Sequence, residues 1–380
     1  MDMINNRRSL LDIEEPHFEE LFRLKSFPVK MGVTETSQDQ DIYADMIFMI
    51  EKETGMVQLK ELVPQDVLYS DAHYNNVASS WKEHHQAFAG LIADYKPCNV
   101  FEIGGGTGLL SKFYTDRVPE VKWTILEASP NPVVGCKANY IKGIFDESYK
   151  IPQGYDAVVH THTMEHFYHP MDSIRAISDS LGEGGHMFLS IPNLEKMYRR
   201  SYTNVMNFEH AFLCIEPYVS EILAENGFLV KERTLFKEEH SVFYVAEKVN
   251  GITARRIDYS CCYEKHKMMI QNWALYHKRL ADKINTKLEN ISGDRDVFLF
   301  GAHVYAQFLL GFGVGQKRIR AVLDNDGSKQ GKRLYGTKYQ VYSPEILRKL
   351  KAPLVILHAG THDEEIKKGI LLINQNAEFI

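Results

Sequence analysis

The sequence has few cysteines, and none of them forms a paired CxxC motif. The five are Cys98, Cys136, Cys214, Cys261 and Cys262. An odd count without such pairs argues against a disulfide scaffold and against a four-cysteine zinc site. A reducing, cytoplasmic setting is the simplest interpretation. The chain also lacks any apolar run of about 18 residues or more, so we expect no membrane-spanning segment. The first residues include arginines but no apolar stretch, so no secretory signal is expected.

An excess of positive charge is also missing. The chain has 44 Lys and Arg against 50 Asp and Glu, a net charge of -6. This balance argues against nucleic acid as the main partner, because binding to phosphates needs clustered Lys and Arg. The composition is otherwise that of an ordinary globular protein, with 44% hydrophobic residues among 380. That length predicts two to three domains.

Strands alternate with helices through the middle of the chain. An apolar strand, a glycine-rich turn and a helix follow one another in NVFEIGGGTGLLSKFYTDR, after an expected helix from Trp81 to Tyr95. Further strands are expected in KWTILEA, DAVVHTHTMEHF and HMFLSIPN, and GFLVKERTLF and HSVFYVAEK are expected to form an antiparallel pair. This alternation predicts an α/β fold with a mostly parallel sheet.

The pattern divides the chain into three parts. Residues 1–84 are predicted to be a small β-rich segment, residues 85–250 an α/β domain, and residues 251–380 a long helix followed by a second α/β unit. In that last unit Gly301 follows a strand and Asp324 ends the next one, but a single glycine stands where a phosphate-binding turn needs several. We therefore expect a nucleotide-binding type of fold that has lost its phosphate turn.

The glycine-rich turn is the most informative segment. Gly104 and Gly106 fit the first two positions of the dinucleotide pattern G-x-G-x-x-G, but Leu109 occupies the third. The glycines run instead as G-x-G-x-G through Gly108, which suits a nucleoside ligand without a pyrophosphate. Glu127 ends the next strand, 127 − 104 = 23 residues after the first glycine. A carboxylate in that place can accept hydrogen bonds from both ribose hydroxyls.

Taken together, these segments resemble the class I S-adenosylmethionine-dependent methyltransferases. VFEIGGGTGLL is similar to their first motif, LEAS to their ribose-binding strand end, and GIFDES to their adenine-binding segment. The resemblance covers about residues 85–245. It implies a Rossmann-like methyltransferase domain with S-adenosylmethionine as cofactor. The cofactor-binding residues that it implies are Glu102, Gly104, Gly105, Gly106, Gly108, Glu127, Ala128, Phe145, Asp146 and His162.

More of the chain resembles a narrower group, the sugar C-methyltransferases that act on nucleotide-linked deoxy-ketosugars and carry a Rossmann-like C-terminal domain. The segments DVLYSDAHYNNVASSWKEHH, NFEHAFLC and FLFGAHVYAQFLLGF carry this resemblance. There are two departures. The group usually opens with a four-cysteine zinc module, whereas this chain has no cysteine before Cys98. Asn207 and Phe208 also stand where the group tends to have Tyr and His.

Transfer of a methyl group to oxygen, or to a carbon beside a ketone, needs a base, and histidine is the usual choice. His210, next to Glu209, follows the fourth strand, where the loops of a parallel sheet meet a ligand crevice. The resemblance adds His166 and Tyr74 as catalytic candidates. Histidines alternating through His160 and His162 without a supporting carboxylate set do not indicate a metal site.

The sequence thus predicts an enzyme that methylates carbon or oxygen of a nucleotide-linked sugar or a related polar metabolite. Two alternatives stay open. One is an O- or N-methyltransferase for a small non-sugar acceptor, and the other is a nicotinamide-dependent oxidoreductase. In each case the expected partner is a small molecule. No nucleic acid or membrane partner is expected, and the oligomeric state is open.

Overall fold

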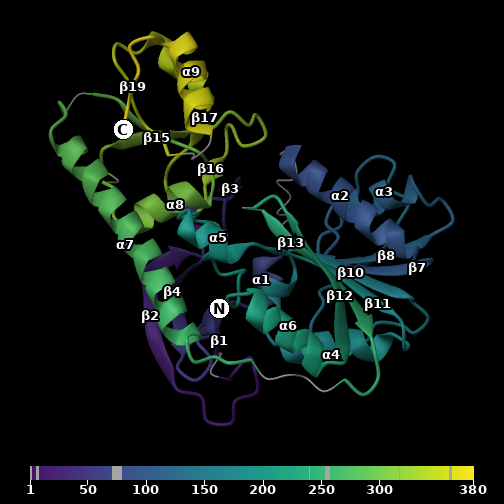
Figure 1. Cartoon of the computed structure of the whole chain (residues 1–380). Coiled ribbons are helices and arrows are strands. Elements are labelled where there is room, and N and C mark those ends of the chain that lie inside the picture. The colour runs from purple at the N-terminus through teal and green to yellow at the C-terminus, as the bar shows by residue number, and fades with distance from the viewer. Residues whose placement is uncertain are drawn as a thin grey trace. The chain divides into compact units, whose positions relative to one another are not determined.

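A computed structural model gives the arrangement of the chain (Figure 1). The residues that it describes are 2–5, 8–70, 79–238, 240–252, 257–293, 295–315, 317–358 and 362–380. They form two compact units. The first comprises residues 1–19, 49–200 and 209–267, and the second comprises residues 20–48, 201–208 and 268–380. Residues 1–84, predicted as one segment, are thus divided between both units.

A seven-stranded sheet forms the centre of the first unit, in the order β12-β13-β11-β10-β7-β8-β9. The strands from β9 to β11 are parallel, and β13 joins antiparallel to both β11 and β12. The strand bounds are β7 Asn99–Ile103, β8 Lys122–Glu127, β9 Asn139–Lys142, β10 Ala157–Thr161, β11 His186–Pro192, β12 Phe228–Phe236 and β13 Ser241–Lys248. The predicted parallel strands and the closing antiparallel pair are confirmed.

Helices lie on both faces of this sheet (Figure 1). Phe88 and Ile92 of α2 and Tyr114 of α3 are buried in one apolar cluster with alternate residues of the strands, among them Val100 of β7 and Val159 of β10. The helix bounds are α1 Gln65–Leu68, α2 Ser79–Tyr95, α3 Leu109–Thr115, α4 Pro170–Ser180, α5 Leu194–Arg199 and α6 Glu216–Glu225, with a 3-10 turn, η2, at Met164–His166. The amphipathic helix expected from Trp81 is α2. Because side chains alternate between the two faces of a strand, every second strand residue packs against α2 and α3.

Short strands accompany this core. β1 (Ile4–Asn5) pairs with β6 (Glu61–Leu62), and β5 (Val57–Leu59) adjoins the end of β4 (Tyr43–Glu51). A turn at Thr54-Gly55 separates β4 from β5, with the Gly55 N–H donating to the Glu51 carbonyl at 2.8 Å.

The second unit contains a five-stranded parallel sheet in the order β17-β15-β14-β18-β19. Its strands are β14 Val297–Phe300, β15 Ile319–Leu323, β17 Val341–Tyr342, β18 Leu354–Ile356 and β19 Glu378–Phe379. Its helices are α8 Val304–Gly311, η3 Pro344–Lys349 and α9 Asp363–Ile373, together with most of α7 (Cys262–Glu289). In chain order the strands run 3-2-1-4-5, the order of doubly wound sheets.

Residues from the predicted N-terminal segment complete this second unit. β2 (Phe18–Pro28) pairs with β4, η1 spans Gln38–Gln40, and β3 (Val33–Thr34) pairs with β16 (Arg333–Leu334). Arg333 donates two hydrogen bonds to the buried carboxylate of Asp41, at 2.6 and 2.7 Å. Such a bidentate pair holds parts of the chain 292 residues apart in one geometry.

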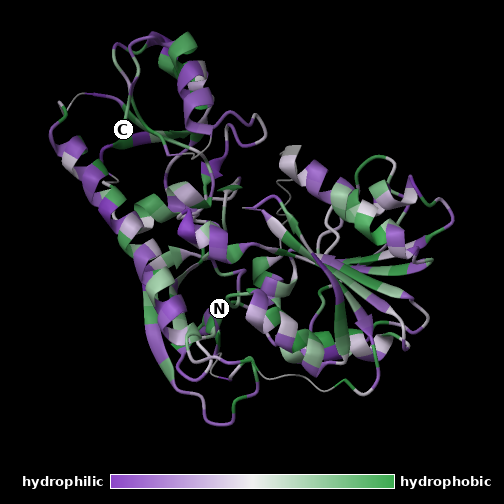
Figure 2. Cartoon of the chain, viewed as in Figure 1, coloured by the Kyte–Doolittle hydropathy of each residue, from purple (hydrophilic) through white to green (hydrophobic). Residues whose placement is uncertain are grey.

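Figure 2 shows the hydropathy of each residue along the chain. α7 carries both hydrophilic and hydrophobic residues along its length, and Ala281, Ile284 and Leu288 on it are buried in the core of the second unit. Within the described residues, none of the helices is both long enough and apolar enough to cross a membrane.

Candidate functional site

A cavity of about 250 Å³ opens at the carboxyl ends of the parallel strands of the first unit. Its walls come from the segments that follow β7, β8, β9 and β10, together with two residues near α1. This is the place where open α/β sheets bind ligands, because the connections diverge on either side of the first strand. The lining residues are Gln65, Tyr69, Ile103, Gly104, Leu126, Glu127, Ala128, Ser129, Gly143, Ile144, Phe145, His162, Thr163, His166 and Phe167.

The glycine-rich turn forms one wall of the cavity. Gly104, Gly106 and Gly108 have left-handed backbones, with φ of +67°, +54° and +69°. Gly104 lines the cavity directly. A Cβ on Gly108 would lie 2.5 Å from the Tyr140 hydroxyl, and one on Gly105 would lie 2.7 Å from the Glu102 carboxyl carbon. The sequence therefore needs glycine here for two reasons, the backbone conformation and the packing behind the turn.

Glu127 ends β8 at the edge of the cavity and is tied to the turn. Its Oε2 accepts a hydrogen bond from the Gly106 N–H at 2.9 Å, and its Oε1 accepts one from the Ser129 N–H at 3.0 Å. Each carboxylate oxygen has a further lone pair for another donor. The carboxylate thus lies in a fixed orientation at the cavity.

Glu102 is placed elsewhere. It is buried behind the turn, does not line the cavity, and its Oε2 accepts a hydrogen bond from the Trp123 indole N–H at 2.7 Å. Burial raises the pKa of Glu102 to about 8, against the opposing effect of this hydrogen bond. The carboxyl group supports the turn from below, so its position is that of a structural residue and not of a ligand contact.

The adenine-binding segment predicted from the sequence is only partly at the cavity. Ala128 and Phe145 line it, and the Phe145 ring lies 5.5 Å from that of Phe167, another lining residue. Asp146 does not line the cavity, and its Oδ1 accepts hydrogen bonds from the N–H and hydroxyl of Ser148, at 2.9 and 2.6 Å. Phe145 thus supplies an aromatic wall.

His162 lines the cavity, but not as the strand residue that the sequence predicted. β10 ends at Thr161, and His162 has a left-handed backbone with φ of +48°. The strand ends here because the chain turns into η2. The His162 N–H still donates to the Ser190 carbonyl of β11 at 2.7 Å. His160, by contrast, is fully buried in the strand.

A cluster of acidic and imidazole groups adjoins the cavity at His166. Its Nδ1 lies 2.9 Å from the Tyr69 hydroxyl and 4.0 Å from a Glu209 carboxylate oxygen. Its ring packs edge-on against that of His210, with centroids 5.2 Å apart. Glu165 is buried beneath, and burial raises its pKa to about 8. The structure therefore brings together three of the four catalytic candidates, Glu209, His210 and His166, with His166 at the cavity wall.

Tyr74, the fourth catalytic candidate, lies outside the described residues. Several cavity residues were not among the predicted site residues, and Tyr69 and Ser129 are two of them. Tyr69 comes 35 residues before the glycine-rich turn. Its hydroxyl contacts His166, which lies 97 residues further along the chain. Ser129 had a local signal, since it lies two residues after the acidic strand end, Glu127.

Comparison with known proteins agrees with this site. Residues 72–232 match the model of the family described as "Methyltransferase domain". This match contains the cavity, apart from Gln65 and Tyr69. Over these residues the chain is thus similar to methyltransferase domains, for which S-adenosylmethionine is the expected cofactor. The match favours methyl transfer over the nicotinamide-dependent oxidoreductase that the sequence left open. None of the curated protein sequences matches the chain.

Solved structures are similar over less than half of the chain. An O-methyltransferase family protein from Burkholderia thailandensis matches with 13% identity and a TM-score of 0.37, over 46% of this chain and 59% of its own. The N-methyltransferase NodS from Bradyrhizobium japonicum matches with 14% identity and a TM-score of 0.36, over 46% of this chain and 99% of its own. The mitomycin 7-O-methyltransferase MmcR matches with 15% identity and a TM-score of 0.37, over 48% and 62%. The chain thus spans less than two thirds of the first and third of these structures.

Proposed function

We propose that the protein methylates a nucleotide-linked sugar or a related polar metabolite, and that His210 is the base. The observation that carries the proposal is the cluster of His166, His210, Glu165 and Glu209 beside the cavity. The segment NFEHAFLC, which contains two of these residues, also carries the resemblance to the sugar C-methyltransferases.

Methyl transfer from a sulfonium is an in-line displacement, and the cofactor supplies the methyl group when bound. The protein must hold the cofactor, orient the acceptor and remove its proton. Glu127 and the backbone of the glycine-rich turn would hold the nucleoside. His166 and His210 would face the acceptor with their imidazole nitrogens, and Glu209 would stabilise the imidazolium that forms when a proton is taken up.

The same histidine serves two versions of the reaction. With a ketosugar, it removes the proton from the carbon next to the carbonyl, and that carbon attacks the methyl group. With a hydroxyl acceptor, it removes the proton from oxygen. Neither version needs another co-reactant, since the electron pair of the broken methyl–sulfur bond stays on sulfur.

A panel of acceptors with labelled S-adenosylmethionine tests this function. Label transfer to a nucleotide-linked ketosugar or sugar, with little to simple phenols or amines, is the expected result. Turnover restricted to small O- or N-nucleophiles without a sugar would overturn the acceptor class and leave the methyltransferase activity in place. Locating the labelled carbon by NMR then separates C- from O-methylation.

Replacing His210 by alanine should lower turnover about 100-fold, the size of a lost general base. Affinity for S-adenosylmethionine should stay unchanged, because His210 does not line the cavity. Calorimetry with the cofactor and initial rates at saturating acceptor separate the two effects. Unchanged turnover in His210→Ala would remove this residue from the mechanism.

Tyr69 holds His166 through the 2.9 Å contact between its hydroxyl and Nδ1. Tyr69→Phe removes that contact while keeping the ring in the cavity wall. We expect kcat to fall about 3- to 10-fold, corresponding to one hydrogen bond of about 1 kcal/mol. The KM for S-adenosylmethionine should change little. A larger change in this KM than in kcat would place Tyr69 at the cofactor and not at the base.

We also infer that residues 251–380 form a helix followed by a Rossmann-like domain that has lost its phosphate turn. The 3-2-1-4-5 order of its parallel strands supports this. Asp324 accepts hydrogen bonds from the N–H groups of Ala302 and Asp326, at 2.8 and 2.9 Å. Glu127 makes the equivalent pair in the first unit. Lys329, 3.2 Å from Asp324, occupies a further site on this carboxylate.

A further inference from the structure

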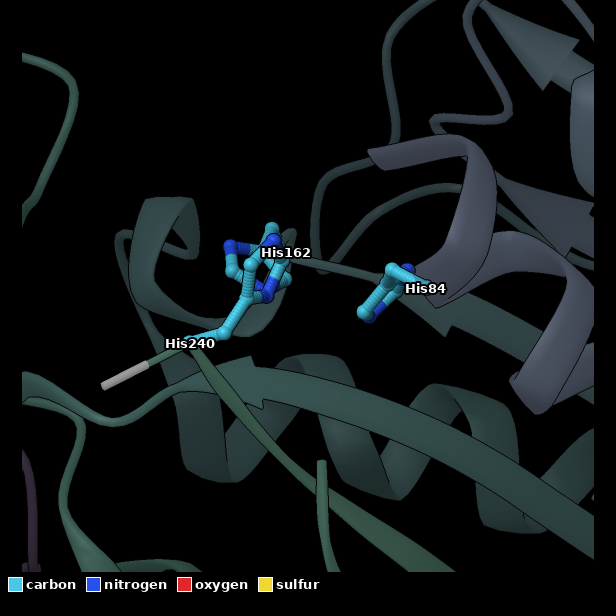
Figure 3. Close-up of side chains that lie close together, drawn as sticks. All are labelled: His84, His162 and His240. Carbon is cyan, nitrogen blue, oxygen red and sulfur yellow. The ribbon is translucent and has the colours of Figure 1, made fainter. Parts of the chain in front are cut away.

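Three histidines from separate segments lie close together, and one of them is His162 of the cavity wall. His84 comes from α2, His162 follows β10, and His240 precedes β13 (Figure 3). One ring nitrogen from each lies within 4.8 Å of the other two. Three nitrogens bound to one Zn²⁺ at about 2.0–2.1 Å would lie closer together, so binding requires the rings to move toward a common centre.

The protonation of these rings suits a cation. Burial, the largest cause, lowers the pKa of His84 to about 2 and that of His240 to about 4, and it lowers the pKa of His162 well below its ordinary value. A neutral imidazole keeps one nitrogen lone pair. A metal ion binds that neutral form.

The neighbouring groups are those that support metal-bound histidines. The Nδ1 atoms of His84 and His85 lie 2.9 Å apart, so one must donate to the other. When His84 donates to His85, its Nε2 carries the lone pair. That Nε2 now contacts the Ser190 hydroxyl at 2.8 Å. Ring N–H groups that donate to a neighbour in this way fix the tautomer of metal-binding histidines.

Ser241 links the other two rings. Its hydroxyl oxygen lies 2.7 Å from Nε2 of His162 and 2.6 Å from Nδ1 of His240. A hydroxyl has one proton, so it can donate to only one of these nitrogens. The hydroxyl thus joins the two rings, and a metal ion bound to both nitrogens would replace it as their partner.

We propose that His84, His162 and His240 bind one Zn²⁺ ion, with the fourth position open to water or to an acceptor oxygen. Imidazole nitrogen is a ligand for zinc and other first-row transition metals, whereas Mg²⁺ and Ca²⁺ select oxygen ligands. Three histidines with one open position is the arrangement of catalytic rather than structural zinc sites. His162 also lines the nucleoside cavity, so the metal would lie next to the cofactor. This site does not depend on which acceptor is methylated.

Trp81 gives the site an optical signal. Its ring lies 4.7 Å from His162, 4.9 Å from His240 and 5.3 Å from His84, measured between centroids. Only three tryptophans occur in the chain. A paramagnetic ion such as Co²⁺ at the three histidines should therefore quench a substantial part of the fluorescence.

The experiment uses the full chain without a histidine tag, stripped with a chelator and then dialysed. Titration with Zn²⁺ in a calorimeter should show one ion per chain, and Co²⁺ should produce tetrahedral absorption bands and quench fluorescence. His240→Gln, at a partly exposed position, should weaken Zn²⁺ binding at least about 100-fold, more than the loss of an outer-shell partner. His186→Gln, on β11 and outside the cluster, is the matched control and should bind as the wild type.

Three results would overturn the proposal: a wild-type chain that binds no Zn²⁺, a His240→Gln variant that binds it equally well, or equal loss in the control. A His210→Gln variant separates the other possible cation site, formed by Glu165, His166 and His210. If His210→Gln loses Zn²⁺ binding and His240→Gln retains it, the metal site is the cluster of Glu165, His166 and His210. Circular dichroism of each variant excludes loss of folding, and if His84→Gln does not fold, His240→Gln carries the test.

Discussion

Glu127→Ala should weaken binding of S-adenosylmethionine about 100- to 1,000-fold. The variant loses an acceptor for two ribose hydroxyls, and hydrogen bonds to a charged group contribute about 1.5–3 kcal/mol each. It also leaves the N–H groups of Gly106 and Ser129 without the carboxylate that each now contacts. The glycine-rich turn would then no longer be held at the cavity. Calorimetric titration with S-adenosylmethionine and with S-adenosylhomocysteine measures the effect.

Glu127→Gln separates the two roles of the carboxylate. The amide keeps one oxygen acceptor for the turn but loses the charge and the second acceptor. We expect it to bind the cofactor more weakly than the wild type and more tightly than Glu127→Ala. Glu120→Gln, an exposed change just before the same strand, should leave affinity unchanged. Cofactor affinity in Glu127→Ala equal to that of the wild type would refute the cavity as the nucleoside site.

The sequence predicted the features that depend on local pattern. The spacing from Gly104 to Glu127 required one strand, one turn, one helix and a second strand. That arrangement places both residues at the same edge of a parallel sheet, and the structure has them at one cavity. Apolar runs likewise identified β7, β8, β10 and β11. β9, a four-residue strand at the edge of the sheet and with no fully buried residue, has too weak an alternation to be recognised.

Contacts between distant segments were beyond local pattern. Asp41 and Arg333 are individually unremarkable, and only the fold brings them to 2.6 Å. The three histidines of the proposed zinc site show the same limit. The sequence draws attention to His160, His162 and His166 because they are close in the chain. His84 and His240 join His162 instead, through contacts between segments that lie far apart in the chain.

Glu102 shows how a motif can be located correctly while the role of one residue differs. The resemblance implies a cofactor contact for it, whereas the structure places its carboxyl under the turn, 2.7 Å from the Trp123 indole nitrogen. A Cβ on Gly105 would meet both this carboxyl and Ile125 at 2.7 Å. The buried carboxyl group of Glu102 thus shapes one side of the turn, and Gly104 lines the cavity on the other side. We therefore predict that substituting Glu102 changes the free energy of unfolding more than it changes the affinity for the cofactor.

Glu102→Gln should make the protein more stable than the wild type at alkaline pH. The native pKa of Glu102, about 8 because of burial, lies above the unfolded value of about 4.3. The native state therefore holds a proton that the unfolded state releases, so stability falls as pH rises through this window and the cost is fully present above about pH 8. A difference of this size corresponds to at most about 5 kcal/mol. Gln keeps an oxygen acceptor for Trp123 without the titration.

Urea unfolding at about pH 5 and pH 9 should show the variant gaining on the wild type by several kcal/mol, whereas Glu120→Gln should show no such gain. Parallel pH profiles for the Glu102 variant and the wild type would mean that Glu102 is ionised in the native protein.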